Sequence, residues 1–145
     1  MDLTEFKKRV SEEKIKNPIL FELETDCIPT SEQINEVELY YKIKIPSSYK
    51  EFLAEYGGGY FACILVYSMD RNSPFYLPSN VGGEFVQKEK FFPIIDLETG
   101  DLAGFRIDDG VCEDSVGIYD HENKIIKDLN IGFFEFVLKY GVKNQ

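Results

Sequence analysis

The most regular pattern of hydrophobic positions lies in the stretch that ends at three consecutive glycines, residues 57–59. Tyr49, Phe52, Leu53 and Tyr56 fall at i, i+3, i+4 and i+7, so all four share one side of a helix. Pro46 suits the first turn of that helix, where a missing N–H costs nothing, and the glycines end it. The pattern predicts a helix with marked boundaries at both ends.

A second helix is predicted immediately upstream. Ile34, Val37 and Tyr41 repeat the helical spacing, and Thr30 with Gln33 is placed to form a capping box. The two helices should pack together, because each carries a hydrophobic stripe that needs covering.

Two further helices are predicted near the ends of the chain. Leu3, Phe6 and Val10 have helical spacing, with Asp2 or Thr4 as the cap and the 17–18 Asn-Pro pair as the end. At the other end, Phe133, Phe136, Val137 and Tyr140 form a stripe between Asn130 and Gly141. Between the N-terminal helix and the helix that begins near Thr30, Ile19, Phe21 and Leu23 alternate with other residues, which allows a short strand or, preferably, a loop.

The middle of the chain reads as strands. One central strand is expected over residues 60–69, followed by strands at 91–96, 102–108 and 115–122 that are separated by the turn sequences ETGD and DGVCED. Pro93 suits an edge or a bulge. Residues 75–77 could add a brief edge strand, and the two glycines at 82 and 83 leave 81–87 ambiguous.

Short strands joined by tight turns pair most easily with their neighbours in sequence, which predicts a mostly antiparallel sheet. With helices before the strands and one after them, the fold class is α+β, with the helices packed against the sheet. No internal repeat or low-complexity linker interrupts the sequence, and 145 residues suit a single domain, 1–145.

The same positions resemble the signature of the SUKH superfamily, the Smi/Knr type. The resemblance is carried by Ile34 and Glu38 on a capped helix, Pro46, Tyr49, the Phe52-Leu53 pair and the three glycines, and then by FFPI at 91–94, Gly100-Asp101, YDHENK at 119–124 and the closing aromatic helix. It covers roughly Thr30 to Gly141 and leaves residues 1–29 as an N-terminal extension. The resemblance implies the same α+β architecture.

The charge is uneven along the chain. The net charge is -10, whereas the first fifty residues are nearly balanced. Between residues 95 and 122, nine acids face Arg106 alone, and these are the candidate partner-binding residues, expected to gather on one side of the fold: Asp96, Glu98, Asp101, Asp108, Asp109, Glu113, Asp114, Asp120 and Glu122. Such a surface repels phosphate backbones and suits a basic protein partner, so nucleic acid is not expected as a ligand.

Catalytic and metal chemistry finds little support in the sequence. The glycines at 57–59 lack the Lys and Ser/Thr of a phosphate loop, so a helix stop is the better interpretation. His121 is the single histidine and is read as a surface residue beside carboxylates, although a base or pH sensor is the alternative. The acidic DDGVCED turn lacks the spacing of a calcium loop. Cys27, Cys63 and Cys112 have no zinc-type spacing and are read as reduced, mostly buried thiols. We therefore expect no enzyme, no cofactor and no metal.

The function expected from the resemblance is that of a bacterial immunity protein, an antitoxin that binds and neutralises a cognate polymorphic toxin, for example a nuclease. The N-terminus is charged and no apolar run is long enough for a membrane helix, so a cytoplasmic protein without membrane contact is expected. The alternative is a regulatory or scaffold module of the kind that controls cell-wall synthesis in fungi. A small-ligand or metal-dependent enzyme ranks third.

Overall fold

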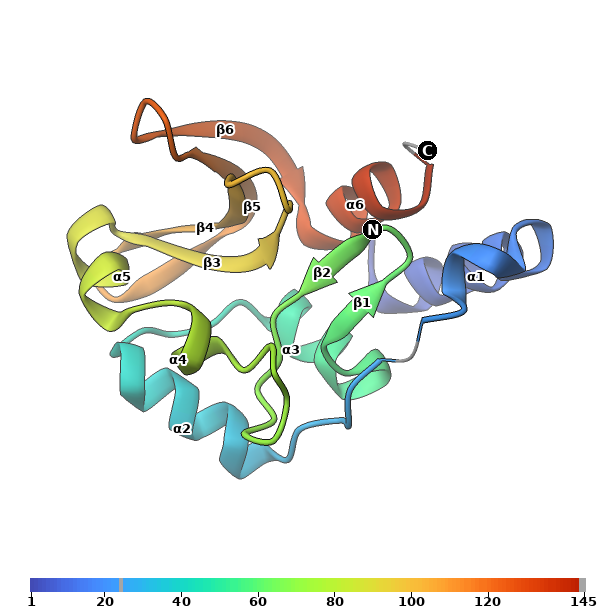
Figure 1. The fold of residues 1–145 in the computed structure, drawn as a ribbon, viewed down its shortest axis with the longest axis horizontal. Coiled ribbons are helices and arrows are strands. Elements are labelled where there is room, and N and C mark those ends of the chain that lie inside the picture. Colours follow the sequence, from blue (N-terminus) through green and yellow to red (C-terminus); the bar gives the residue numbers. More distant parts are fainter. Residues whose placement is uncertain (24, 144–145) are drawn as a thin grey trace.

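The computed structural model describes the backbone of residues 1–23 and 25–143 and the side chains of 1–23 and 25–142. In this part of the chain, six strands form one antiparallel sheet (Figure 1). The strands are β1 (Gly59–Phe61), β2 (Ile64–Val66), β3 (Phe91–Asp96), β4 (Leu102–Asp108), β5 (Val111–Asp120) and β6 (Ile125–Gly132). The helices are α1 (Leu3–Lys16), the 3-10 helix η1 (Pro18–Phe21), α2 (Ser31–Tyr41), α3 (Ser47–Tyr56), α4 (Leu77–Asn80), α5 (Gly83–Glu89), α6 (Phe133–Phe136) and the π-helix η2 (Val137–Lys143).

The order of the strands in the sheet is their order in the sequence. Each strand from β1 to β6 pairs with the next, and every pairing is antiparallel. The α+β class and the antiparallel sheet are thus confirmed.

The helices α1, α2 and α3 begin and end where the sequence indicates. Thr30 and Gln33 form the capping box of α2, with Gln33 N–H donating to Thr30 Oγ1 at 3.2 Å and Thr30 N–H donating to Gln33 Oε1 at 2.9 Å. The side chain of Asp2 caps α1 by accepting from Glu5 N–H. Gly57 ends α3, and Pro46 occupies its N-cap.

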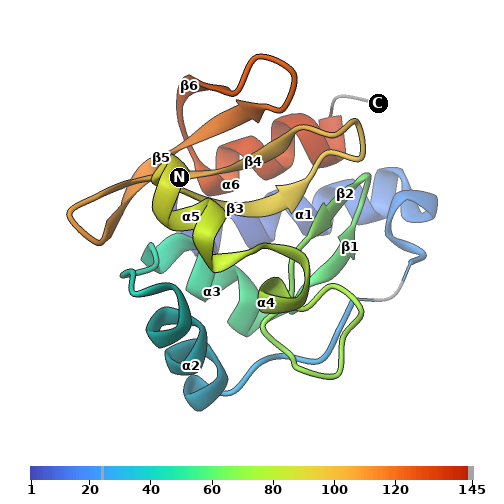
Figure 2. The same cartoon turned by 60° about the vertical axis from the view of Figure 1, so that its left-hand side comes forward.

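The core covers both faces of β3, because consecutive strand residues point to opposite sides. Phe92 packs edge-on against Tyr41 and Tyr49, which α2 and α3 supply. Phe91 faces the other way and packs against Tyr119, whose ring also contacts Phe85 of α5. In Figure 2, α5 accordingly lies on the near side of the sheet and α6 on the far side. The bulge expected at Pro93 is present in the β3–β4 pairing.

The single central strand expected over residues 60–69 is wrong. The segment forms a hairpin of two short strands, β1 and β2, and β1 is the outermost strand of the sheet. Ala62 has a positive φ of 51° and begins the turn. The chain reverses there although neither Ala nor Cys is a typical turn residue, so the hydrophobic run hides the turn.

Three other regions differ from the expectation. Residues 83–89 form helix α5, whose glycines occupy the N-cap and the first helical position, where they do little harm. Residues 111–114 belong to β5 because the turn is confined to Asp109 and Gly110, both with positive φ. Residues 125–132 form β6, an edge strand that the sequence analysis did not predict. Its exposed residues do not alternate regularly with buried ones, so the usual pattern of a strand is missing.

The remaining differences are local. Residues 18–21 form a 3-10 helix and neither a strand nor an irregular loop, while Tyr76 makes only an isolated bridge to Ser68 in place of an edge strand. The C-terminal helix runs past Gly141 as the π-helix η2. Cys112 is buried as expected, but Cys27 and Cys63 are exposed.

Candidate functional site

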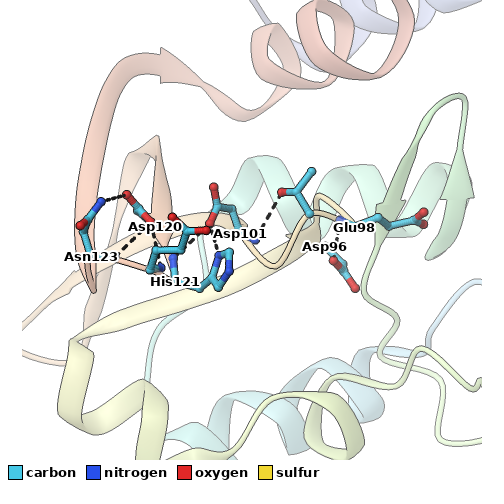
Figure 3. Close-up of polar contacts among 8 residues, drawn as sticks. Asp96, Glu98, Asp101, Asp120, His121 and Asn123 are labelled. Atoms are coloured by element: carbon cyan, nitrogen blue, oxygen red, sulfur yellow. Dashed lines mark hydrogen bonds and ion pairs between the residues drawn. The ribbon is translucent and has the colours of Figure 1, made fainter.

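Five of the nine candidate acids lie together at one end of the sheet, at the ends of β3 and β5 and in the connections that follow them. These residues, here called the acidic end, are Asp96, Glu98, Asp101, Asp120 and Glu122. The strand register brings the two connections together, because Asp96 pairs with Leu102 and Leu102 pairs with Tyr119. Figure 3 shows both turns and their side chains.

A contact between Asp101 and His121 joins the two connections. Asp101 Oδ1 lies 2.6 Å from His121 Nδ1 and accepts a second hydrogen bond, of 3.0 Å, from the backbone N–H of His121 (Figure 3). The imidazole packs flat over Gly100, because a Cβ placed there would lie 2.6 Å from its Cε1 atom. A glycine at position 100, which also has a φ of +97°, is therefore what allows the ring to lie in this position.

The acidic side chains also shape their own turns. Asp120 accepts from the backbone N–H groups of Glu122 and Asn123, and from the Asn123 side chain at 2.8 Å. Asp96 Oδ1 accepts from Glu98 N–H at 2.7 Å. Asp96 and Asp120 are thus fixed by turn geometry, whereas Glu98 and Glu122 extend from the turns as exposed side chains.

These contacts determine the charge of the pair. The hydrogen bond from His121 lowers the pKa of Asp101, and the same bond raises the pKa of His121, with smaller contributions from the charges of Asp101, Glu122 and Asp120. The hydrogen bonds from Asn123 lower the pKa of Asp120. Asp101 and Asp120 are therefore ionised well below neutral pH, and His121 gains charge more readily than a free imidazole.

The other four candidate acids, Asp108, Asp109, Glu113 and Asp114, lie towards the opposite end of the sheet, around the β4–β5 turn. Strand β4 separates Asp108 from Leu102 by six residue steps, which is roughly 20 Å. Basic side chains are close to two of them: Lys42 and Lys90 line one cavity with Asp109, and the charge of Glu113 acts on Arg106, whose ion-pair partner is Asp128 at 2.7 Å. The nine acids are therefore divided between the two ends of the sheet, five at the acidic end and four at the other.

Comparison with protein-family models gives one match. The model described as SUKH_6, SMI1-KNR4 cell-wall, matches residues 31–137, which is well over half of the chain. This chain belongs to the SUKH superfamily. No curated protein and no solved structure gave a significant match. The matched SUKH region contains the whole acidic end and leaves α1, η1 and the segment that follows η1 outside the family pattern.

Only part of the acidic end of this SUKH protein can be predicted from the sequence. The sequence identifies its acids and places His121 beside carboxylates on the surface, but it does not identify Asp101 as the partner of His121. Asp101 and His121 are twenty positions apart, so the contact depends on the β4–β5 register. Gly100, directly before Asp101, is a sequence signal for this contact, because it lies in the turn next to the DHEN turn at 120–123.

Asp101, Asp120 and His121 also offer metal-ligand atoms within 4.8 Å of one another. Their best-placed atoms already take part in the hydrogen bonds described above, which explains the cluster without an ion. An Asp–His pair is also the orienting part of a catalytic triad. Among the described residues, however, no serine, threonine or cysteine hydrogen-bonds the other ring nitrogen of His121. Across the same residues, no helix of this SUKH protein is long and apolar enough to cross a membrane.

Proposed function

We propose that this SUKH protein is a non-enzymatic immunity protein, an antitoxin that binds and neutralises a cognate bacterial toxin through its acidic end. The observation that carries the proposal is the convergence of five carboxylates from two turns that Asp101 and His121 hold together. Because these turns are fixed by short hydrogen bonds, the charges are presented in a defined arrangement and little ordering is needed when a partner binds.

The partner that fits this surface is a basic protein. A nuclease carries a cationic surface to hold its substrate, and a compact acidic protein can occupy that surface in place of phosphates. Charge complementarity mainly accelerates encounter and sets orientation, so buried contacts must supply most of the affinity. We expect the complex to form in the cytoplasm, with no cofactor and no nucleic acid.

The direct test is co-expression with the product of the adjacent toxin gene, followed by affinity purification and a growth assay. The expected result is a stable complex and restored growth. If no toxin is encoded nearby, or if a toxin is present and neither binds nor becomes less harmful, the immunity function is rejected.

The role of the acidic end is tested by two matched double variants. Glu98→Lys with Glu122→Lys reverses two charges at the acidic end, whereas Asp108→Lys with Glu113→Lys reverses two at the opposite end. We expect the first pair to weaken toxin binding by about tenfold or more, chiefly through slower association, and the second to change it by less than about twofold. Equal effects would show that the acidic end is not the docking surface.

A second candidate function follows from the family description, which refers to cell walls. In this case the protein is a regulatory or scaffold module for a protein resident in the same cell. Purification of the tagged protein from cells that lack the toxin gene distinguishes the two, because only the regulatory module would retain a specific partner there.

A further inference from the structure

A groove of about 600 Å³ lies between the N-terminal extension and the corner where α3 meets β1. In Figure 1, the segment after α1 passes beside β1 on its way to α2. The lining includes four aromatic rings and two carboxylates. We call this set the aromatic groove: Phe21, Tyr56, Tyr60, Phe61, Asp26 and Glu55.

The rings of the aromatic groove already hold a cation from this chain. The ammonium group of Lys14 lies 5.5 Å from the centroid of Phe21 and 6.0 Å from that of Tyr56. Phe61 packs edge-on against both of these rings, at centroid distances of 5.6 and 5.1 Å, and so fixes their orientation. Aromatic faces carry negative electrostatic potential, so this geometry attracts positive charge.

Carboxylates reinforce that preference. Asp26 and Glu55 line the groove, and Glu55 Oε1 is exposed enough to pair with Lys7 Nζ at 3.2 Å. Tyr60 lies next to the acidic end, because its hydroxyl donates a hydrogen bond to the Glu98 carboxylate, which raises the pKa of Tyr60. Tyr60 is therefore a point of contact between the groove and the acidic end.

The rim of the groove is apolar and exposed. Leu23 and Ile28 line it and remain 60% and 55% exposed. Both belong to the extension outside the matched family region, residues 31–137. An exposed hydrophobic rim around a cation-attracting centre is the arrangement of an interface anchor, where apolar contacts exclude water from a central charged or aromatic contact.

We propose that the aromatic groove receives a cationic side chain, arginine in preference to lysine, from a basic loop of the protein partner. Arginine is favoured because its planar guanidinium stacks on rings and pairs with carboxylates at the same time. The identity of that partner as a toxin rests on the proposed function, whereas the binding chemistry of the groove does not. The extension, which lies outside the family match, would thus contribute to partner choice.

The test uses the full chain and a small probe, N-acetyl-Gly-Arg-Gly-amide, with the citrulline peptide as a neutral control of the same shape. Binding is followed by NMR through the ring and backbone signals of Phe21, Tyr56 and Tyr60. We expect the arginine peptide to bind at these positions about fivefold more tightly than the citrulline peptide, as a cation–π contact at an exposed site would give. Equal shifts from both peptides, or shifts confined to other residues, would overturn the proposal.

Variants of exposed groove residues sharpen the test. Lys14→Met removes the internal cation and keeps the length of the side chain, so the arginine peptide should bind about threefold more tightly. Glu55→Gln should weaken binding about twofold, and Glu84→Gln, an exposed acid on α5 outside the groove, should leave it unchanged. Unaltered binding to Lys14→Met would show that the rings are not the site.

The outcome is separable from that of the proposed function. Arginine-selective binding without a toxin complex would support the groove and reject immunity. A toxin complex that forms while the groove fails to distinguish arginine from citrulline would do the opposite.

Discussion

At the scale of single residues, the contact between Asp101 and His121 decides how the acidic end is built. Both groups are exposed enough to titrate, with exposed side-chain fractions of 32% and 45%. The raised pKa of His121 and the lowered pKa of Asp101 both favour the charged forms, so at mildly acidic pH the pair ties two turns together and removes part of the repulsion among the neighbouring carboxylates. A solvent-exposed pair of this kind contributes little to overall stability and more to local geometry.

The pair predicts an NMR result. Because His121 is the single histidine, its imidazole signal can be followed without assignment. We expect a pKa above the ordinary value in the native protein and a shift back towards it in Asp101→Asn, which removes the hydrogen bond that raises it. Asp114→Asn, the same change at an exposed acid at the opposite end of the sheet, serves as the control. An unchanged His121 pKa in Asp101→Asn would contradict the pairing.

The contributions of the two partners to stability depend on pH in opposite directions. The raised pKa of His121 makes its contribution complete below the unfolded value and removes it as the pH rises through the folded value. The lowered pKa of Asp101 makes its contribution complete above the unfolded value and removes it as the pH falls. Clamping of the two turns is therefore strongest at mildly acidic pH.

At the scale of elements, the sequence predicted helices better than strands. The stripes and caps of α1, α2 and α3 are local signals, and nearby residues satisfy them. The β1–β2 hairpin and β6 pair with neighbours in the sequence, but the usual local signals are missing. Ala62 and Cys63 are not typical turn residues, and β6 does not alternate buried with exposed residues. The turn of the β1–β2 hairpin is also held by a distant contact, because Cys63 N–H donates to Gly141 C=O at 3.0 Å.

The bulge between β3 and β4 offers a sharp test of strand packing. A Cβ added at Gly104 would lie 2.1 Å from the carbonyl oxygen of Phe92, which is backbone and cannot move aside. We expect Gly104→Ala to lower the free energy of unfolding by about 3 kcal/mol or more, measured by chemical denaturation.

Gly82→Ala is the matched control for that measurement. No atom lies within 4 Å of a Cβ added at Gly82, and its φ is -67°, so the change meets no clash and should cost about 1 kcal/mol or less, through the weaker N-cap of α5. A similar stability of both variants would mean that β3 and β4 do not approach as closely as the structure indicates.

At the scale of the whole molecule, composition indicates the sign of the net charge but not its distribution. The candidate acids lie in one segment of the sequence, residues 96–122, yet successive turns of an antiparallel sheet lie at opposite ends of it. Four acids therefore lie at one end of the sheet, where Asp109 shares a cavity with Lys42 and Lys90, and five lie at the acidic end. The strands predicted at 102–108 and 115–122 already imply this division, because the turns before and after the first of them lie at its opposite ends.

The concentration of charge predicts how association depends on salt. If the acidic end docks a basic toxin, the association rate should fall at least about tenfold between 50 mM and 500 mM salt, while dissociation changes much less. Stopped-flow kinetics measures both. The Glu98→Lys and Glu122→Lys double variant should lose most of this salt dependence, and retention of the full dependence would place the docking charge elsewhere.

The order of the strands has a consequence for how the protein is made. Since every strand pairs with the one synthesised just before it, each new hairpin can add to the sheet as it leaves the ribosome, without threading between segments already joined. The C-terminal helices are the exception, because η2 returns to β2 and α6 packs against α1 and α3. Assembly in this sequence leaves few intermediates waiting for distant parts of the chain, which would suit a protective protein that has to be ready before its target becomes active.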